Sequence, residues 1–202
     1  MAIRAVRKRI TKRPDERRQD IIDAAVRVFA ERGVHGTTVA HITQAAEVAK
    51  GTFYLYFDSK EHLLAVLKER WVDESLARAA ELLEKVGRAD WWALVDTAVE
   101  NFVDYMLEHR DLIHVFVQEG ITEATSEIFA ECHRKLDMMF ASGIQAGVEA
   151  GAFHTTDPML TAQLLHNALE GTIVNSILYG QALERERLVA VAKETARKIL
   201  AP

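Results

Sequence analysis

The stretch that decides the fold covers residues 37–60 and reads TTVAHITQAAEVAKGTFYLYFDSK. Thr38 is a suitable N-cap for a short helix, because its side-chain oxygen can accept a hydrogen bond from a backbone N–H in the first turn. Glu47 and Val48 then form a turn, and a second short helix, dense in aromatic residues, follows over residues 49–57. Two short helices joined by a tight turn are typical of a helix-turn-helix module, whose second helix enters the major groove of DNA.

The remaining sequence predicts helices and no strands. No proline occurs between Pro14 and Pro158, glycine is sparse, and alternating strand-like runs are hard to find. We therefore predict an all-α protein of about nine helices, in which Gly33 ends the first helix as a left-handed cap. A long fourth helix begins after Asp58 or Ser59, and the later helices are expected near residues 91–108, 111–119, 121–147, 158–179 and 184–200, with an interruption at Gly143.

The charge of the chain is segregated. The net charge is −5, yet residues 1–60 hold 12 Lys and Arg against 7 Asp and Glu, whereas residues 61–202 hold 13 against 23. The basic part coincides with the helix-turn-helix signal, and positive charge near phosphates supplies much of the affinity for nucleic acid. The single Cys132 fits a reducing compartment, and no apolar run is long enough for a membrane span, so we expect a cytoplasmic protein that does not enter a membrane.

The second short helix of the module carries the residues expected to read DNA. Gly51 allows its backbone to approach the duplex closely, and Lys50 can reach a phosphate or a guanine edge. Thr52 offers a hydroxyl and a methyl group at the level of the bases, while the hydroxyls of Tyr54 and Tyr56 can bind phosphates. Phe53 and Phe57 are four residues apart on another face, where we expect them to anchor the helix on Phe29 and Ile42.

The motif AKGTFYLYFDSKEHLL closely resembles the signature of the TetR-type bacterial transcription regulators. The resemblance implies that Lys50, Thr52, Tyr54 and Tyr56 touch DNA and that Gly51 gives the close approach. It also implies that Thr38 and Lys60, at the N-termini of the second and fourth helices, hold phosphates. One departure is Ala49, where many relatives carry Ser or Thr.

We expect three parts with different roles, the first from its basic residues and lack of apolar periodicity and the other two in line with the resemblance. Residues 1–12 would form a basic flexible arm, residues 13–60 the DNA-binding domain, and residues 61–202 a bundle for ligand binding and dimerisation. The resemblance implies a homodimer built by the last two long helices. Both helices are apolar over much of their circumference, but packing within one chain would also bury this surface. The candidate interface residues are Leu165, Leu169, Ile173, Ile177, Leu188 and Val191.

A ligand pocket inside the C-terminal bundle is a further implication of the resemblance. We take its candidate residues from the bulky apolar and the polar positions of the bundle: Trp92, Phe102, Met106, Phe116, Phe129, Phe140, His133, His166, Asn167 and Glu170. His166 and Glu170 share one helix face, and a carboxylate inside an apolar stretch needs a partner. The ordinary alternative for the aromatic residues is plain core packing, and for the histidines a satisfied core or surface position.

The functional hypothesis is a sequence-specific DNA-binding regulator, a repressor released from a palindromic operator by a hydrophobic or amphipathic small molecule. The alternative is a DNA-binding regulator without such a ligand, controlled by a protein partner. An enzyme is disfavoured, because the sequence shows no nucleophile–base pair, phosphate loop or metal cluster. We expect no metal and no cofactor.

Overall fold

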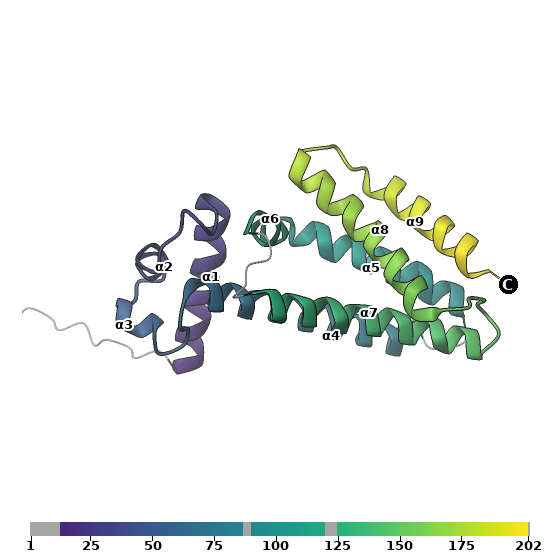
Figure 1. The fold of residues 1–202 in the computed structure, drawn as a ribbon, viewed down its shortest axis with the longest axis horizontal. Helices are drawn as coiled ribbons and strands as arrows, with labels where there is room; N and C mark the ends of the chain where they lie inside the picture. The colour runs from purple at the N-terminus through teal and green to yellow at the C-terminus, as the bar shows by residue number, and fades with distance from the viewer. Residues whose placement is uncertain (1–12, 87–89, 120–124, 202) are drawn as a thin grey trace, which may run out of the picture. The chain divides into compact units, whose positions relative to one another are not determined.

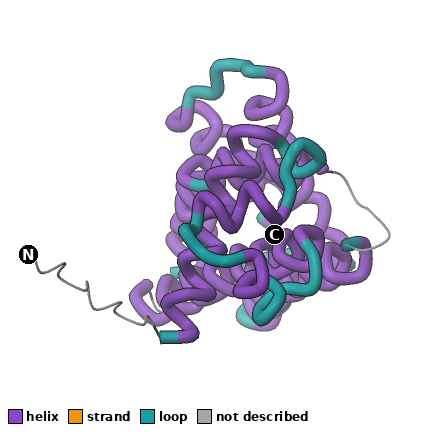
Figure 2. Tube along the Cα trace, turned by 90° about the vertical axis from the view of Figure 1, so that its left-hand side faces the viewer, coloured by secondary structure: helices purple, strands orange, loops and turns teal. Residues whose placement is uncertain are grey.

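The computed structural model describes residues 13–86, 90–119 and 125–201, and the predicted N-terminal arm over residues 1–12 lies outside them. Within these three segments the chain forms nine helices and no strand (Figures 1 and 2). The predicted all-α fold is therefore confirmed. The helices are α1 (Pro14–Arg32), α2 (Val39–Ala45), α3 (Lys50–Phe53), α4 (Lys60–Val86), α5 (Trp91–Glu108), α6 (Arg110–Glu119), α7 (Ser126–Glu149), α8 (Pro158–Tyr179) and α9 (Arg185–Leu200).

The chain divides into two compact units, Met1–Lys60 and Glu61–Pro202, which we call the first and second units. In the first unit α2 packs against α1 and α3 against α2. One face of α1 is fully enclosed, and this face is apolar at helical spacing, which is how an amphipathic helix buries itself. Its buried residues are Ile21, Ile22, Ala24, Ala25, Val28 and Phe29.

Two connections in the first unit differ from the prediction. Gly33 has a positive φ of 67° but a ψ of 164°, so it lies outside the left-handed helical region that we expected, although its N–H does close α1 on the carbonyl of Phe29 at 2.8 Å. In the turn between α2 and α3, Glu47 has a φ of 55°, which is uncommon for a residue other than glycine. α3 is also shorter than predicted, because the chain leaves the helix after Phe53.

In the second unit α7 packs along α8, while α5 contacts α9, α8 and α6. Two of the helix starts follow directly from their capping residues. Asp90 accepts hydrogen bonds from the backbone N–H groups of Trp92 and Ala93, and Asp157 accepts one from Leu160 at 2.9 Å. α7 runs without a break through Gly143, so the predicted interruption there is wrong.

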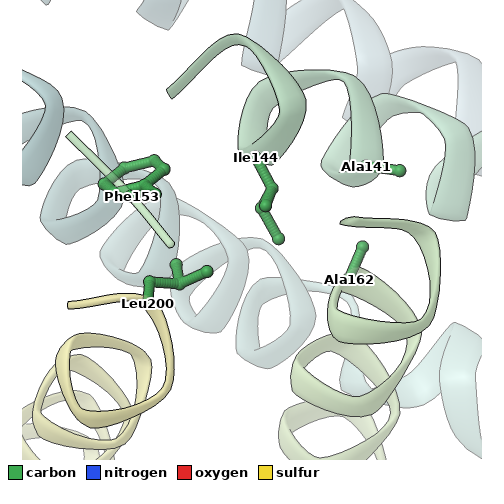
Figure 3. Close-up of a cluster of buried hydrophobic side chains, with 5 residues drawn as sticks. All are labelled: Ala141, Ile144, Phe153, Ala162 and Leu200. Carbon is green, nitrogen blue, oxygen red and sulfur yellow. The ribbon is translucent and has the colours of Figure 1, made fainter. Parts of the chain in front are cut away.

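One buried apolar cluster lies at an end of the second unit. It joins Ala141 and Ile144 of α7, Phe153 of the following loop, Ala162 of α8 and Leu200 of α9 (Figure 3). The loop is fixed by backbone bonds, since the N–H of His154 donates to the carbonyl of Leu200 at 2.8 Å. The cluster therefore ties the end of α9 to the end of α7.

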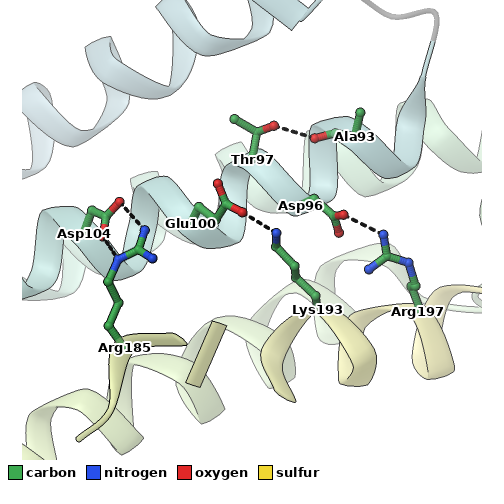
Figure 4. Close-up of polar contacts among 8 residues, drawn as sticks. All are labelled: Ala93, Asp96, Thr97, Glu100, Asp104, Arg185, Lys193 and Arg197. Atoms are coloured by element: carbon green, nitrogen blue, oxygen red, sulfur yellow. Dashed lines mark hydrogen bonds and ion pairs between the residues drawn. The ribbon is translucent and has the colours of Figure 1, made fainter. Parts of the chain in front are cut away.

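A ladder of ion pairs holds α9 against α5 (Figure 4). Arg185 pairs with Asp104 at 2.7 Å, Lys193 with Glu100, and Arg197 with Asp96 at 2.7 Å. The acidic residues recur every four positions, so that all three lie on one face of α5. The guanidinium of Arg185 lowers the pKa of the Asp104 carboxyl below its ordinary value, chiefly through the hydrogen bond between them.

Candidate nucleic-acid interface and ligand cavity

Neighbouring residues at the end of α3 have opposite environments. The rings of Phe53 and Phe57 are completely buried and lie 5.5 Å apart, centroid to centroid. Tyr54 and Leu55, which lie between them in the sequence, are 51% and 78% exposed. The buried pair holds the segment on the first unit, and the residues between are left facing outward. Tyr54 also packs edge to face on Phe53, with 5.4 Å between the ring centroids.

The start of α3 is open to solvent. Lys50 and Gly51 are exposed, and Thr52 and Tyr56 are partly buried. A Cβ atom added at Gly51 would find no described protein atom within 4 Å, and Gly51 does not require a positive φ. Neither packing against the described residues nor backbone geometry therefore demands glycine at position 51.

The side chains of Thr38 and Lys60 form different hydrogen bonds around the loop before α2. The Thr38 side chain accepts a hydrogen bond from the backbone N–H of His41, and the His41 side chain accepts one from the N–H of Thr38. This reciprocal cap confirms Thr38 as the N-cap of α2. The ammonium of Lys60 donates to the carbonyls of Val34 and Thr37, at 2.6 and 3.0 Å. The Lys60 side chain is thus bound to the loop before α2. A phosphate contact at this position would therefore be made by the backbone N–H groups at the N-terminus of α4.

Leu55 is a candidate interface residue that the sequence reasoning missed. It is a large apolar side chain, 78% exposed, at the centre of the segment that otherwise carries the proposed DNA contacts. Apolar side chains in a major groove contact the methyl group of thymine. The sequence already indicated that Leu55 is exposed, because this residue does not share the helix face on which Phe53 and Phe57 lie.

The second unit contains a cavity of about 340 Å³, a volume at the small end of the range for small-molecule sites. Its walls come from α4, α5, α7, α8 and α9 and are mainly apolar. Small side chains are frequent among them, including Ala79, Ala98, Gly143, Ala168 and Ala192. The polar residues on the wall are Ser75, Asn101, His166, Thr172 and Thr195.

Only three of the ten predicted pocket residues, Phe102, Phe140 and His166, line this cavity. The structure places the other seven elsewhere. Trp92 packs on Phe153, His133 and Asn167 are exposed, and Glu170 lies beside His166 without reaching the cavity wall. The remaining three, Met106, Phe116 and Phe129, are buried core residues. Helical spacing identified these positions as apolar, but it could not distinguish a core contact from a cavity wall.

A polar network joins α7 and α8 next to the cavity. Nδ1 of His166 lies 3.1 Å from Oδ1 of Asp137, whose Oδ2 accepts from Gln163 at 3.1 Å. Nε2 of His166 lies 3.9 Å from Oε2 of Glu170, which is too far for a hydrogen bond. The His166 side chain is only 2% exposed, so this network lies in the interior.

Lys68 of α4 is buried in an aromatic cage. The residue is 7% exposed, and its ammonium lies 4.4, 5.0 and 5.7 Å from the ring centroids of Trp71, Phe116 and Phe129. Contact with ring faces stabilises a cation, but burial favours the neutral amine. Burial lowers the pKa of Lys68, and the nearby negative charge of Glu170 partly opposes this shift.

Replacing Lys68 with methionine is expected to remove a pH-dependent contribution to stability. Because the pKa of Lys68 is lower in the folded state, the unfolded chain binds more protons, and stability rises with pH up to the ordinary lysine pKa near 10.5. The free energy of unfolding of Lys68→Met, measured in urea between about pH 7 and pH 9.5, should lack this rise. Lys85→Met, at a side chain that is 75% exposed, is the control and should follow the wild-type slope. Equal slopes in Lys68→Met and the wild type would refute the assignment.

The predicted dimer residues lie mostly inside the subunit. Ile173 is fully buried, Ile177 is partly buried, and Leu165, Leu169, Leu188 and Val191 line the cavity. A different apolar surface is exposed, which we call the α8–α9 face. It consists of Met159, Leu160, Leu164 and Tyr179 of α8 with Val191 and Ile199 of α9. Of the predicted residues, only Val191 belongs to this face, at 54% exposure.

Two kinds of feature are absent from residues 13–86, 90–119 and 125–201. No group of three or more His, Cys, Asp or Glu side chains in them is arranged to hold a metal ion. None of their helices combines the length and the apolar character that crossing a bilayer requires.

Comparison with known proteins gives two family matches. Residues 21–67 match the family described as bacterial regulatory proteins, tetR family, and residues 89–174 match the tetracyclin repressor-like C-terminal domain. The fatty acid metabolism regulator protein of Bacillus subtilis is 30% identical over 169 residues, which cover 80% of this chain and 84% of that protein. The HTH-type transcriptional regulator YuxN of the same species is 31% identical over 123 residues. This match covers 60% of this chain but only 40% of YuxN.

A solved structure shares the fold over most of the chain. The transcriptional regulator FadR from Bacillus subtilis, determined in complex with stearoyl-CoA, aligns with a TM-score of 0.75 at 22% identity. The alignment covers 88% of this chain and 96% of that chain.

Proposed function

The chain belongs to the TetR family of bacterial transcription regulators, and on that premise we propose that it is a repressor that binds a palindromic operator as a homodimer and leaves it when a small molecule enters the cavity. The protein is a transcription regulator and not an enzyme. The observation that carries the proposal is the division of residues 50–57 into a buried anchor and an exposed face.

The DNA contacts that we propose lie on that exposed face. Lys50 supplies a positive charge, Thr52 and Tyr56 supply hydroxyls at the edge of the segment, and the ring of Tyr54 projects outward. Thr38 contributes a hydroxyl at the N-terminus of α2, and the N-terminus of α4 at Lys60 attracts a phosphate. The open surface above Gly51 allows the duplex to approach the backbone of α3.

Gly51→Ala is expected to weaken DNA binding while leaving the fold intact. The added methyl group meets no described atom of the protein, and alanine is the better helix former by about 1 kcal/mol. The same methyl group would stand between α3 and the duplex, so we expect a loss of about tenfold or more in operator affinity. Thermal unfolding and fluorescence anisotropy of labelled operator DNA measure the two effects. An unchanged operator affinity would remove Gly51 from the interface.

Lys50→Ala is expected to lower both the affinity and its dependence on salt. A side chain that neutralises one phosphate contributes about one unit to the slope of log affinity against log salt concentration. Affinities measured across a salt series should therefore give a slope smaller by about one. Lys85→Ala, in the second unit, is the matched control and should leave the slope unchanged. A wild-type slope in Lys50→Ala would contradict the phosphate contact.

The α8–α9 face supports the homodimer part of the proposal. Leu160 and Leu164 are four residues apart on α8, while Ala162 and Ile173 of the same helix are buried within the subunit. A helix that is apolar on opposite sides is stable when both sides are covered. A second copy would cover the exposed side by pairing α8 and α9 with their symmetry mates in a four-helix seam.

The effector that we propose is hydrophobic or amphipathic, because the cavity wall is mainly apolar. The fold neighbour FadR was solved with stearoyl-CoA, and the relative from Bacillus subtilis is named as a fatty acid metabolism regulator, which supports an acyl chain or a similar apolar body here. The cavity also favours a small-molecule signal over control by a protein partner alone.

Helix α4 provides the connection between the two sites. Ser75, Ala79 and Leu82 of α4 line the cavity, and Lys60, the first residue of the same helix, binds the carbonyls of the loop before α2. We propose that an effector which moves α4 changes the position of this loop and of the Thr38 cap. The effector must then bind more tightly to the conformation that does not fit the operator.

The experiment for this part is a test of reciprocity. Operator affinity is measured against increasing concentrations of a candidate effector, and effector affinity is measured with and without operator. Linkage requires that the two affinities fall by the same factor. An effector that binds in the cavity but leaves operator affinity unchanged would contradict the proposed release.

A further inference from the structure

Among the large apolar side chains of residues 13–86, 90–119 and 125–201, that of Leu55 is the most exposed. It is 78% exposed, whereas Phe53 and Phe57, two residues away on either side, are buried. A single exposed leucine is common on protein surfaces, so its meaning depends on the side of the molecule that carries it. Burial of this side chain by a partner would be favourable, because apolar surface would leave water.

The backbone places Leu55 on the open side of α3. The α-helix ends at Phe53, but the chain continues in a tight turn, in which the N–H of Leu55 donates to the carbonyl of Thr52 at 3.3 Å. Residues three and four positions apart lie on the same side of such a turn, so Leu55 follows Gly51 and Thr52 on their side. A Cβ added at Gly51 would have no described atom within 4 Å. Leu55 therefore extends the surface that we propose for the approach of the duplex.

The side chain of Leu55 differs chemically from the other proposed DNA contacts. Lys50, Thr52, Tyr54 and Tyr56 each carry a group that can hydrogen-bond a phosphate or a base edge, whereas leucine carries none. In the major groove, the apolar group that the four base pairs present is the 5-methyl group of thymine. A leucine placed over a polar base edge would remove water from it without replacing the hydrogen bond. A leucine placed over the methyl group would remove apolar surface of both groups from water.

We propose that Leu55 is a specificity-determining residue, which packs against the 5-methyl group of a pyrimidine in each half-site of the operator. The inference rests on the proposed function, since it requires that α3 binds an operator. The group that Leu55 recognises is the methyl group itself, which thymine and 5-methylcytosine share. The polar contacts around Leu55 supply affinity and orientation, and Leu55 adds the preference for a methylated pyrimidine at its position.

Replacing thymine with deoxyuridine tests this contact, because it removes the methyl group and keeps the base pair. The operator obtained by selection with the full chain is synthesised with deoxyuridine at one symmetry-related pair of thymine positions at a time. Fluorescence anisotropy then gives the affinity for each DNA. At one pair of positions we expect the affinity of the wild type to fall about fifteenfold, since one buried methyl group corresponds to about fourfold in each half-site.

Leu55→Ala shows whether the lost affinity belongs to this side chain. The variant should bind the thymine and deoxyuridine operators almost equally at that pair of positions. Val117→Ala, at an exposed apolar side chain of α6 in the second unit, is the control and should keep the wild-type ratio of affinities. The ratio is the decisive quantity, because a general loss of stability would lower both affinities alike.

A second comparison separates the methyl group from the rest of the thymine base. At the same pair of positions, the wild type should bind 5-methylcytosine more tightly than cytosine, both paired with guanine, and Leu55→Ala should not.

The outcomes distinguish the inference from the proposed function. Equal affinity of the wild type for thymine and deoxyuridine at every position would overturn the inference while leaving operator binding intact. The same losses in Leu55→Ala as in the wild type would overturn it as well, because another side chain would then contact the methyl group. A selection that yields no operator would contradict the proposed function, and the inference with it.

Discussion

Phe53→Ala is expected to destabilise the first unit by about 3–5 kcal/mol, whereas Tyr54→Ala should change its stability by no more than about 1 kcal/mol. Phe53 is completely buried and packs on Phe57, so truncation leaves a cavity in a small core. Tyr54 is 51% exposed and loses only its edge-to-face contact with Phe53. The two substitutions, at adjacent aromatic residues, should therefore lower the free energy of unfolding by amounts that differ severalfold.

In operator binding by the folded protein, the order is reversed, and Tyr54 should contribute more to the affinity than Phe53. Tyr54→Ala is expected to weaken operator binding by about 1–3 kcal/mol, because the exposed ring and hydroxyl face the duplex. Chemical denaturation followed by circular dichroism gives the stability of each variant, and anisotropy of labelled operator gives the affinity. The division into anchor and contact would be refuted if Tyr54→Ala unfolded the unit or bound operator as tightly as the wild type.

Gly147→Ala is expected to destabilise the second unit by about 1–3 kcal/mol, the cost of forcing an extra methyl group into a packed core. A Cβ at position 147 would overlap the ring of Phe153, with Cγ of that ring only 2.9 Å away. Phe153 cannot move aside easily, because Trp91 and Trp92 both pack edge to face against it (centroids 5.9 and 5.0 Å away). The end of the bundle shown in Figure 3 should loosen as a result.

Gly143→Ala is the matched control on the same helix. Position 143 lies one turn before Gly147 in α7, and an added Cβ there has no described atom within 4 Å. Alanine should therefore stabilise α7 by up to about 1 kcal/mol through its higher helix propensity. Urea denaturation of the two variants should move the midpoint in opposite directions. A destabilisation of equal size in both would mean that helix geometry, and not the Phe153 ring, requires glycine at position 147.

The helices were predictable because their starts depend on local chemistry. Thr38, Asp90 and Asp157 each cap the helix that follows, as their residue types and positions indicate. The buried roles of Phe53 and Phe57 were equally readable, because two large apolar residues four positions apart share a helix face. The length of α3 was not predictable from the sequence, since the chain leaves the helix after Phe53 without a proline or glycine to end it.

The cavity could not be located from the sequence for a physical reason. A cavity forms where facing side chains are small, as at Ala79, Ala98 and Gly143, whereas the prediction selected bulky residues. Bulky residues such as Phe116 and Phe129 fill space and become core, here around Lys68. The exposed α8–α9 face could not be identified for a similar reason, because α8 is apolar around most of its circumference and the spacing of its apolar residues then indicates no single buried side.

Selection of bound fragments from random DNA by the purified full-length chain, with Gly51→Ala as a parallel sample, tests the central claim most directly. The account predicts that the wild type enriches a palindrome whose half-sites are spaced for two recognition helices in successive major grooves, about 34 Å or more apart. It also predicts that the folded Gly51→Ala variant enriches the palindrome poorly or not at all. No enriched sequence with the wild type, or equal enrichment by the variant, would contradict the account.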